Sequence, residues 1–201
     1  MQKKGIPPME EKFIVEKTFE RKAFSKNGFE KGEYELCTFL NCNFSNADLS
    51  NILFTDCEFY DCNLSGATIF QTGFQNILFK DCKLLGLHFD KSSDFGFSIQ
   101  VDHCQLNHSS FYKRKLSKTR FKKSKLEAVD FTACDLSFSV FDNCDLKNAV
   151  FNTTNLQNAD FRNSYNFTID PENNRIKGAK FTLDTVVGLL TKYNIKIEPN
   201  Y

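Results

Sequence analysis

A five-residue repeat is the feature of this sequence that most restricts its fold. Between Leu126 and Phe161 a large apolar residue returns at every fifth position, and Leu and Phe alternate there. This period matches neither the roughly 3.6 residues of an α-helical turn nor the roughly two residues of a strand. The backbone must therefore turn a corner within every repeat. We expect the apolar residue at the centre of each repeat to point into a common interior.

The residue two positions before each centre is mostly small, which predicts a second inward-facing position in every repeat. All eight cysteines of the chain occupy it: Cys37, Cys42, Cys57, Cys62, Cys82, Cys104, Cys134 and Cys144. A free cysteine behaves as a small apolar side chain. We therefore predict reduced, buried and poorly reactive thiols, rather than disulfides or metal ligands.

This pattern of a small residue, Asp or Asn, and then Leu or Phe resembles that of pentapeptide-repeat proteins, and the resemblance covers most of the chain. Proteins of that family fold as an all-β, right-handed quadrilateral β-helix, in which four pentapeptides make one coil. The resemblance implies a solenoid with four sides, in which like residues of successive coils stack. Phe121, Phe141 and Phe161 are then expected in one column.

The repeat divides the chain into three segments. Residues 1–18 are charged and irregular, and we expect them to lead into the coil or to cap it. Residues 19–181 follow the period, except for a register slip at 90–100, where Gly96 supplies backbone freedom, and an irregular loop at 162–175. Residues 182–201 have the apolar spacing of a short α-helix followed by a short strand, which we expect to cap the coil and to form a dimer.

No motif for catalysis or cofactor binding accompanies the repeat. The sequence has no phosphate-binding glycine loop, no nucleophile elbow and no credible pair of catalytic carboxylates. His103 and His108 should face solvent while Cys104 points inward, so these residues are not expected to share a metal ion. We therefore expect a protein that is not an enzyme and that uses neither cofactor nor metal.

Charge is balanced in number but unevenly placed, with 26 Lys and Arg against 25 Asp and Glu. The basic run from Lys113 to Lys125 has two interpretations: a footprint for phosphate backbones, or a solvated belt wrapped around one coil. We favour the belt, because successive positions turn around four sides, and direct nucleic-acid binding is not expected. Arg114 occupies an inward position, so either its side chain leaves at a corner or the coil is deformed there.

Within its family the chain is most similar to the Qnr quinolone-resistance and microcin B17 immunity proteins. The similarity lies in FKDC, FGFSIQVDHCQL and DFRNSYNFTIDPENNRIKGAKF, and in the apolar helix and short strand that follow. It implies a cytoplasmic homodimer that binds DNA gyrase, a type II topoisomerase, and protects it from inhibitors, in part by DNA mimicry. The candidate contacts are the outward carboxylates of Asp130, Asp135, Asp145 and Asp160.

The near-neutral charge departs from that group, whose DNA-mimicking members are clearly acidic. The alternative is a structural or adaptor rod that binds another protein, unrelated to topoisomerase. A continuous acidic face would favour gyrase, whereas mixed charge with an apolar patch would favour the adaptor.

Two further expectations concern location and assembly. No apolar run is long enough to span a bilayer and the first residues lack the apolar core of a signal peptide, so a cytoplasmic protein without membrane contact is expected. The last segment carries more apolar residues than one side of a capping helix needs. We therefore predict a homodimer interface there, through Val186, Leu189, Tyr193 and Ile195.

Overall fold

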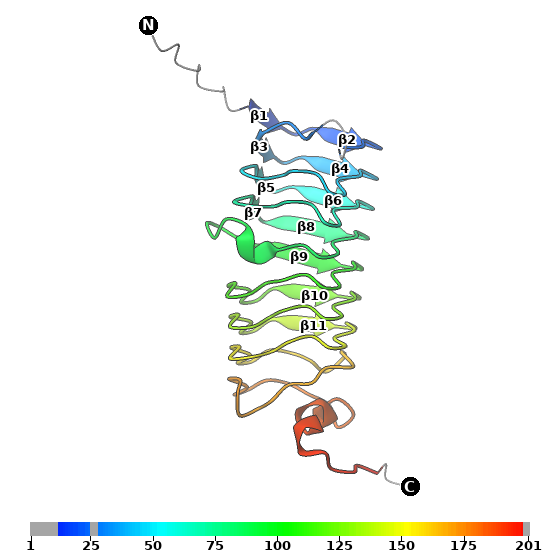
Figure 1. Cartoon of the computed structure of the whole chain (residues 1–201), viewed down its shortest axis with the longest axis vertical. Helices are drawn as coiled ribbons and strands as arrows, with labels where there is room; N and C mark the ends of the chain where they lie inside the picture. Colours follow the sequence, from blue (N-terminus) through cyan, green and yellow to red (C-terminus); the bar gives the residue numbers. More distant parts are fainter. Residues whose placement is uncertain (1–11, 25–27, 199–201) are drawn as a thin grey trace, which may run out of the picture.

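The computed structural model, which describes residues 12–24 and 28–198, is a parallel β-solenoid that forms a long rod (Figure 1). Seven parallel strands form one sheet in the spatial order β11-β10-β9-β8-β6-β4-β2, and four form another in the order β1-β3-β5-β7. The strands of the larger sheet are β2 (Thr18–Glu20), β4 (Thr38–Leu40), β6 (Glu58–Tyr60), β8 (Ile77–Lys80), β9 (Ile99–Asp102), β10 (Arg120–Lys122) and β11 (Val140–Asp142). The smaller sheet contains β1 (Lys12–Val15), β3 (Gly32–Glu35), β5 (Leu53–Thr55) and β7 (Gly73–Gln75). The predicted all-β solenoid is therefore confirmed.

The other two sides of the rod are held by single bridges between coils. Asn43 is bridged to Asn63 on one of these sides, and Asp48 to Thr68 on the other. Within each coil the corners are made by residues with positive φ, at five-residue intervals. Asn and Asp are common at these corners, as at Asn41, Asn46, Asn51, Asp56 and Asp61. Their short polar side chains tolerate the left-handed region better than most residues do.

The interior is filled by stacked side chains. The Phe121 and Phe141 rings stack at a centroid distance of 5.0 Å, and Phe141 and Phe161 at 4.8 Å, so the predicted column is confirmed. All eight cysteines are buried and free, as predicted. Their thiols bond to backbone carbonyls of the coil, as from Cys62 Sγ to Phe39 O at 3.3 Å. The inward small position thus combines filling with hydrogen bonding.

The register slip lies between β8 and β9. Strand partners are 20 residues apart elsewhere, as in Phe39 with Phe59, but Ile77 pairs with Ile99. The extra residues form a 3₁₀ turn, η1 (Phe89–Lys91), and the loop that follows it, where Gly96 has a φ of 65°. This loop projects at the left edge of the rod in Figure 1.

Arg114 holds this loop from inside the coil. Its side chain is buried, and its Nε donates to Phe89 O at 2.7 Å. Its two terminal nitrogens donate to Ser92 O, Ser93 O and the Asp94 carboxylate. The guanidinium also lies 4.9 Å from the centre of the Phe97 ring. The coil is therefore deformed around an arginine, and the extra residues supply its acceptors.

The structure shows where the coil begins and how far the segment 162–175 departs from it. β1 pairs with β3, so residues 12–18 already belong to the first coil rather than to a lead-in; residues 1–11 lie outside the described chain. The segment 162–175 keeps the register of the coil at two points, because Tyr165 is bridged to Asp145 and Arg175 to Asn155.

The C-terminal segment does not form the predicted α-helix. It contains two 3₁₀ turns, η2 (Val186–Leu189) and η3 (Thr191–Tyr193), and residues 194–198 form no strand. The carbonyl of Gly188 accepts the amide of Ile169 at 3.0 Å, so it is engaged by the coil rather than by an α-helical partner. The β-branched residues around it also favour other conformations. Gly188 packs so closely on Phe167 that a Cβ would collide with its ring and carbonyl.

Candidate functional site

The four aspartates predicted as partner contacts lie on four different sides of the rod. Each belongs to a separate column of bridged residues: Ser110–Asp130–Val150, Lys115–Asp135–Asn155, Lys125–Asp145–Tyr165 and Val140–Asp160–Lys180. Successive pentapeptides occupy successive sides of a coil, so no single flat surface contacts all four carboxylates. The structure brings none of these four residues together.

These aspartates also stabilise the bends of their own repeats. Asp130 accepts the amide of Thr132 at 2.9 Å, and Asp135 accepts the amide of Ser137 at 3.1 Å. Asp160 bonds to Arg162 at 2.7 Å, and this bond holds the pKa of Asp160 below its ordinary value. Asp at this repeat position therefore has a local structural role, which it fulfils through an oxygen that Asn also carries.

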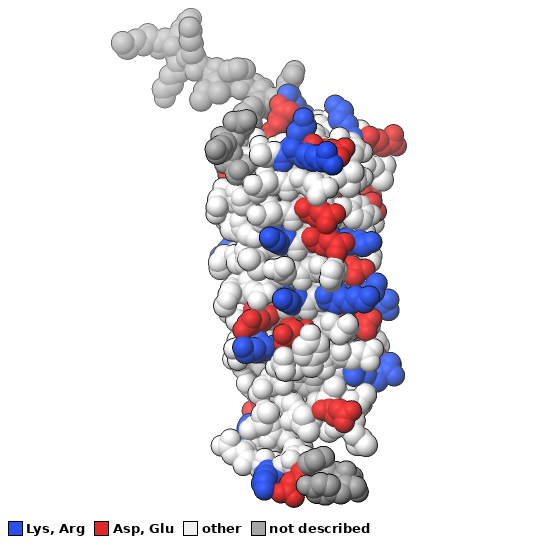
Figure 2. Space-filling model, turned by 90° about the vertical axis from the view of Figure 1, so that its right-hand side faces the viewer, with Lys and Arg blue, Asp and Glu red and all other residues white. Residues whose placement is uncertain are grey.

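The basic run is distributed around the rod, as the belt interpretation predicts. Lys115 is bridged to Asp135 on one side, Arg120 and Lys122 lie in β10 on the next, and Lys125 is bridged to Asp145 on a third. Lys122 forms an ion pair with Asp102 at 3.0 Å. Figure 2 shows acidic and basic side chains mixed along the face in view, without a continuous acidic surface.

The histidines form no cluster with the cysteine between them. His103 bonds to Asp81 at the surface, while Cys104 is buried and its thiol bonds to Phe79 O at 3.4 Å. Among the residues that the structure describes, no group of three or more His, Cys, Asp or Glu could hold a metal ion. In the same part of the chain, no helix is long and apolar enough to cross a membrane.

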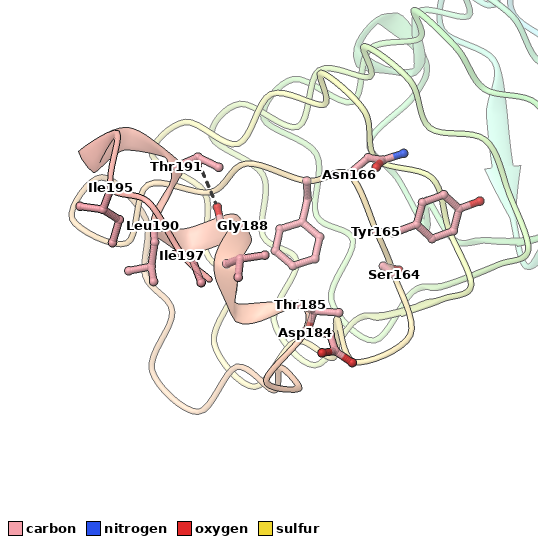
Figure 3. Close-up of a pocket in the computed structure, with 12 residues that line it drawn as sticks. Ser164, Tyr165, Asn166, Asp184, Thr185, Gly188, Leu190, Thr191, Ile195 and Ile197 are labelled. Atoms are coloured by element: carbon pink, nitrogen blue, oxygen red, sulfur yellow. Dashed lines mark hydrogen bonds between the residues drawn. The ribbon is translucent and has the colours of Figure 1, made fainter. Parts of the chain in front are cut away.

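A groove of about 650 Å³ lies at the C-terminal end of the rod, between residues 164–167 and 184–197 (Figure 3). Leu190, Ile195 and Ile197 line one part of it, and Ser164 and Tyr165 lie opposite. Ile195 and Ile197 are each half exposed. The lining is thus apolar and in contact with solvent.

The predicted dimer residues differ in position around this groove. Tyr193 and Ile195 are exposed, and the Tyr193 hydroxyl donates to Glu172 at 2.8 Å. Val186 is half-buried, and Leu189 packs against the core of the coil, so its side chain is largely taken up within the chain.

Several exposed apolar residues lie outside the predicted contacts, and three of them stand out. Leu183 is 90% exposed and Ile197 50%, beside the C-terminal groove, while Phe95 is 81% exposed in the loop that Arg114 holds. The alternation in the final segment was a signal for Ile197. Nothing in the period marked Phe95, since it lies where the register slips.

Comparisons with known proteins agree with this geometry. The family described as Pentapeptide repeats matches residues 37–76 and 130–165, in eight copies. A trypsin-treated point variant of QnrB1, a plasmid-mediated fluoroquinolone resistance protein, is 22% identical; the match covers 94% of this chain and 98% of that one, with a TM-score of 0.53. Full-length QnrB1 is 21% identical, with coverages of 92% and 100% and a TM-score of 0.50. No curated protein matched the sequence.

The likeness to QnrB1 is one of fold, since both identities are low. It agrees with the repeat in the sequence, the parallel coils and the family match. Two stretches of the chain thus match the pentapeptide-repeat family, and the rod as a whole shares the β-solenoid fold of QnrB1.

Proposed function

We propose that this chain is a non-enzymatic rod that binds another protein through its outer surface. The observation that carries this proposal is the filled interior of the coil. Inward side chains such as Phe121, Phe131 and Phe141 fill it, and each is fully buried. Any partner must therefore bind to the sides or the ends of the rod.

DNA gyrase is the partner that we propose to test first. The support is the similarity in fold to QnrB1, a fluoroquinolone resistance protein, over nearly the whole of both chains. Purified gyrase should be assayed for supercoiling and for quinolone-induced DNA cleavage, with and without this protein. Restored supercoiling in the presence of the drug is the expected result. Drug inhibition that is unchanged at every protein concentration would contradict the proposal.

A gyrase contact by DNA mimicry would use the aspartates of one side only. We therefore propose single replacements Asp130→Asn, Asp135→Asn, Asp145→Asn and Asp160→Asn. Asparagine keeps the oxygen that accepts the bend amide while the charge is removed, so the fold should be retained. We expect one of the four variants to weaken protection and the others to match the parent. Equal protection by all four would refute mimicry through these residues.

An adaptor rod for a different protein is the second candidate. It is favoured by the mixed surface charge and by the exposed apolar groove at the C-terminal end. This candidate predicts that the folded protein leaves gyrase unprotected. It also predicts that the protein retains a defined cellular partner in cross-linking.

We further propose that a second copy covers the C-terminal groove and so forms a homodimer. Ile195, Ile197 and Tyr193 are exposed in or beside the groove. Replacement of Ile195 by Glu should convert a dimer into a monomer in sedimentation analysis, because burial of a charge opposes the contact. Lys196→Glu is the matched control, since it changes the neighbouring exposed charge. A parent protein that sediments as a monomer at micromolar concentration would contradict the dimer.

A further inference from the structure

Two coils of the rod carry opposite charges at the same three outward positions. The first is an acidic triplet, Asp56, Glu58 and Asp61, and the second is a basic triplet, Lys118, Arg120 and Lys123. In the described part of the chain none of these six side chains forms an ion pair. Asp56 instead accepts from Asn76 at 2.6 Å, and Glu58 accepts from the Tyr60 hydroxyl at 3.0 Å.

The sheet register places the two triplets in the same three columns. Glu58 pairs with Leu78, and Leu78 pairs with Gln100. Since Phe121 pairs with Val101, Arg120 follows Gln100 in this column. The triplets are therefore three coils apart, or about 14 Å at the usual strand spacing. They are symmetric about a point between β8 and β9.

A two-fold axis through that point, perpendicular to the rod, would place each column against itself in reverse order. Asp56 would then face Lys118 of a second copy, Glu58 would face Arg120 and Asp61 would face Lys123. Each pair occurs twice because of the symmetry. Nearer the axis, the same operation sets Lys80 against Asp102 and Asp81 against His103.

The ends of these columns carry apolar residues that the fold of one chain does not use. Leu36 is 49% exposed and Phe138 is 54% exposed, although both occupy corner positions, with φ of 53° and 58°. The two-fold axis places Leu36 against Phe138 of the second copy. The outward residues of this sheet form four columns, which begin at positions 36, 38, 40 and 41 and end at positions 138, 140, 142 and 143. In these four columns the two-fold axis brings no two like charges face to face.

We propose that two copies of this chain pack side by side and antiparallel through the β2–β11 sheet. Charge complementarity along the sheet identifies the occupant as another copy, because an acidic or a basic partner would match only one triplet. The contact is one side of the rod wide, at the small end of specific interfaces, so we expect weak association that salt reduces. It lies apart from the apolar C-terminal groove and does not depend on the proposed function.

Carbodiimide cross-linking tests the contact directly, because this reagent joins a carboxylate and an amine that touch. Within one chain the triplets are too far apart to react. A mixture of isotopically light and heavy protein should therefore give mixed-isotope links from Asp56 to Lys118 and from Asp61 to Lys123. The yield should fall on the order of tenfold between about 50 and 500 mM salt. The absence of such links at low salt would overturn the proposal.

Charge reversal supplies a second test. An acid-reversed variant (D56K, E58K, D61K) and a base-reversed variant (K118E, R120E, K123E) should each lose lateral association, because their triplets repel. An equimolar mixture should regain it, since a lysine triplet then meets a glutamate triplet. Circular dichroism checks that both variants stay folded. A mixture that fails to associate would refute the pairing, as would a base-reversed variant that still self-associates and has lost only affinity for duplex DNA.

Discussion

Replacement of Arg114 by Ala should destabilise the rod far more than replacement of either basic neighbour. The side chain is 3% exposed and enters the coil at a position that elsewhere holds a small residue. Its loss removes one side-chain donor to Ser93 O, at 3.1 Å, and one to Ser92 O. The Phe89 carbonyl keeps the amide and hydroxyl of Ser92 as donors, so it is less affected.

The magnitude follows from these contacts. Loss of the donor to the buried Ser92 carbonyl costs about 1–3 kcal/mol, the half-buried Ser93 carbonyl adds less than that, and the emptied space adds to this cost. The ion pair contributes little, because the Asp94 side chain is 95% exposed. We expect R114A to lower the free energy of unfolding by about 3–5 kcal/mol, as the sum of the lost carbonyl donors and the cavity. D94A should lower it by less than about 1 kcal/mol.

Equilibrium unfolding in urea measures both values, and Lys115→Ala is the matched control. Lys115 is the next residue, is exposed and forms no side-chain ion pair in the described chain, so its loss should change stability by less than about 0.5 kcal/mol. Cleavage of the loop at residues 92–98 by a protease should also become faster in R114A. A free energy of unfolding for R114A within about 1 kcal/mol of the parent's would contradict this structural role of Arg114, and so would an equally large loss in D94A.

Four other predictions concern the core and the corners. Phe141→Ala should cost about 3–5 kcal/mol in urea unfolding, because it leaves a cavity in a stacked column; a cost below about 1 kcal/mol would contradict that packing. Thr153 is a β-branched residue with a φ of 52°, so Thr153→Gly should stabilise by about 1 kcal/mol. Thr154→Val should destabilise by a similar amount, because the buried Thr154 hydroxyl donates to Phe131 O at 2.8 Å. A destabilised Thr153→Gly variant would contradict the strain at Thr153, and a stabilised Thr154→Val variant would contradict the role of this hydrogen bond. Burial raises the pKa of three thiols to about 12: Cys57, Cys134 and Cys144. Unfolded thiols ionise at about pH 8.5, so each of these thiols should contribute stability that is complete below that pH and declines by about 2 kcal/mol by pH 10. Thiol labelling of the native protein at pH 8 should be slow, and equal stability at pH 8 and pH 10 would contradict this prediction.

The sequence alone determined the repeating geometry, because that geometry is a local property. Each repeat has one large and one small inward residue, and a five-residue period permits few backbone paths other than a cornered coil. The burial of Phe141 and of all eight cysteines followed from their positions in the five-residue repeat. A further local signal was available but unused: Asn, Asp and Gly recur at the corners, where Asn46 and Gly66 both have positive φ.

Only the tertiary structure decided where the pattern bends and what its outward residues meet. The position of Arg114 was unusual in the sequence, but its acceptors lie 20 or more residues away, in the loop of the preceding coil. The C-terminal cap became 3₁₀ because Gly188 binds Ile169 and packs on Phe167, contacts that helical spacing does not encode. The four candidate aspartates were neighbours in the sequence and lie on four sides of the rod, because each repeat turns the chain by one corner. A period records which residues face inward, whereas the surface that a partner meets depends on how coils align across long sequence separations.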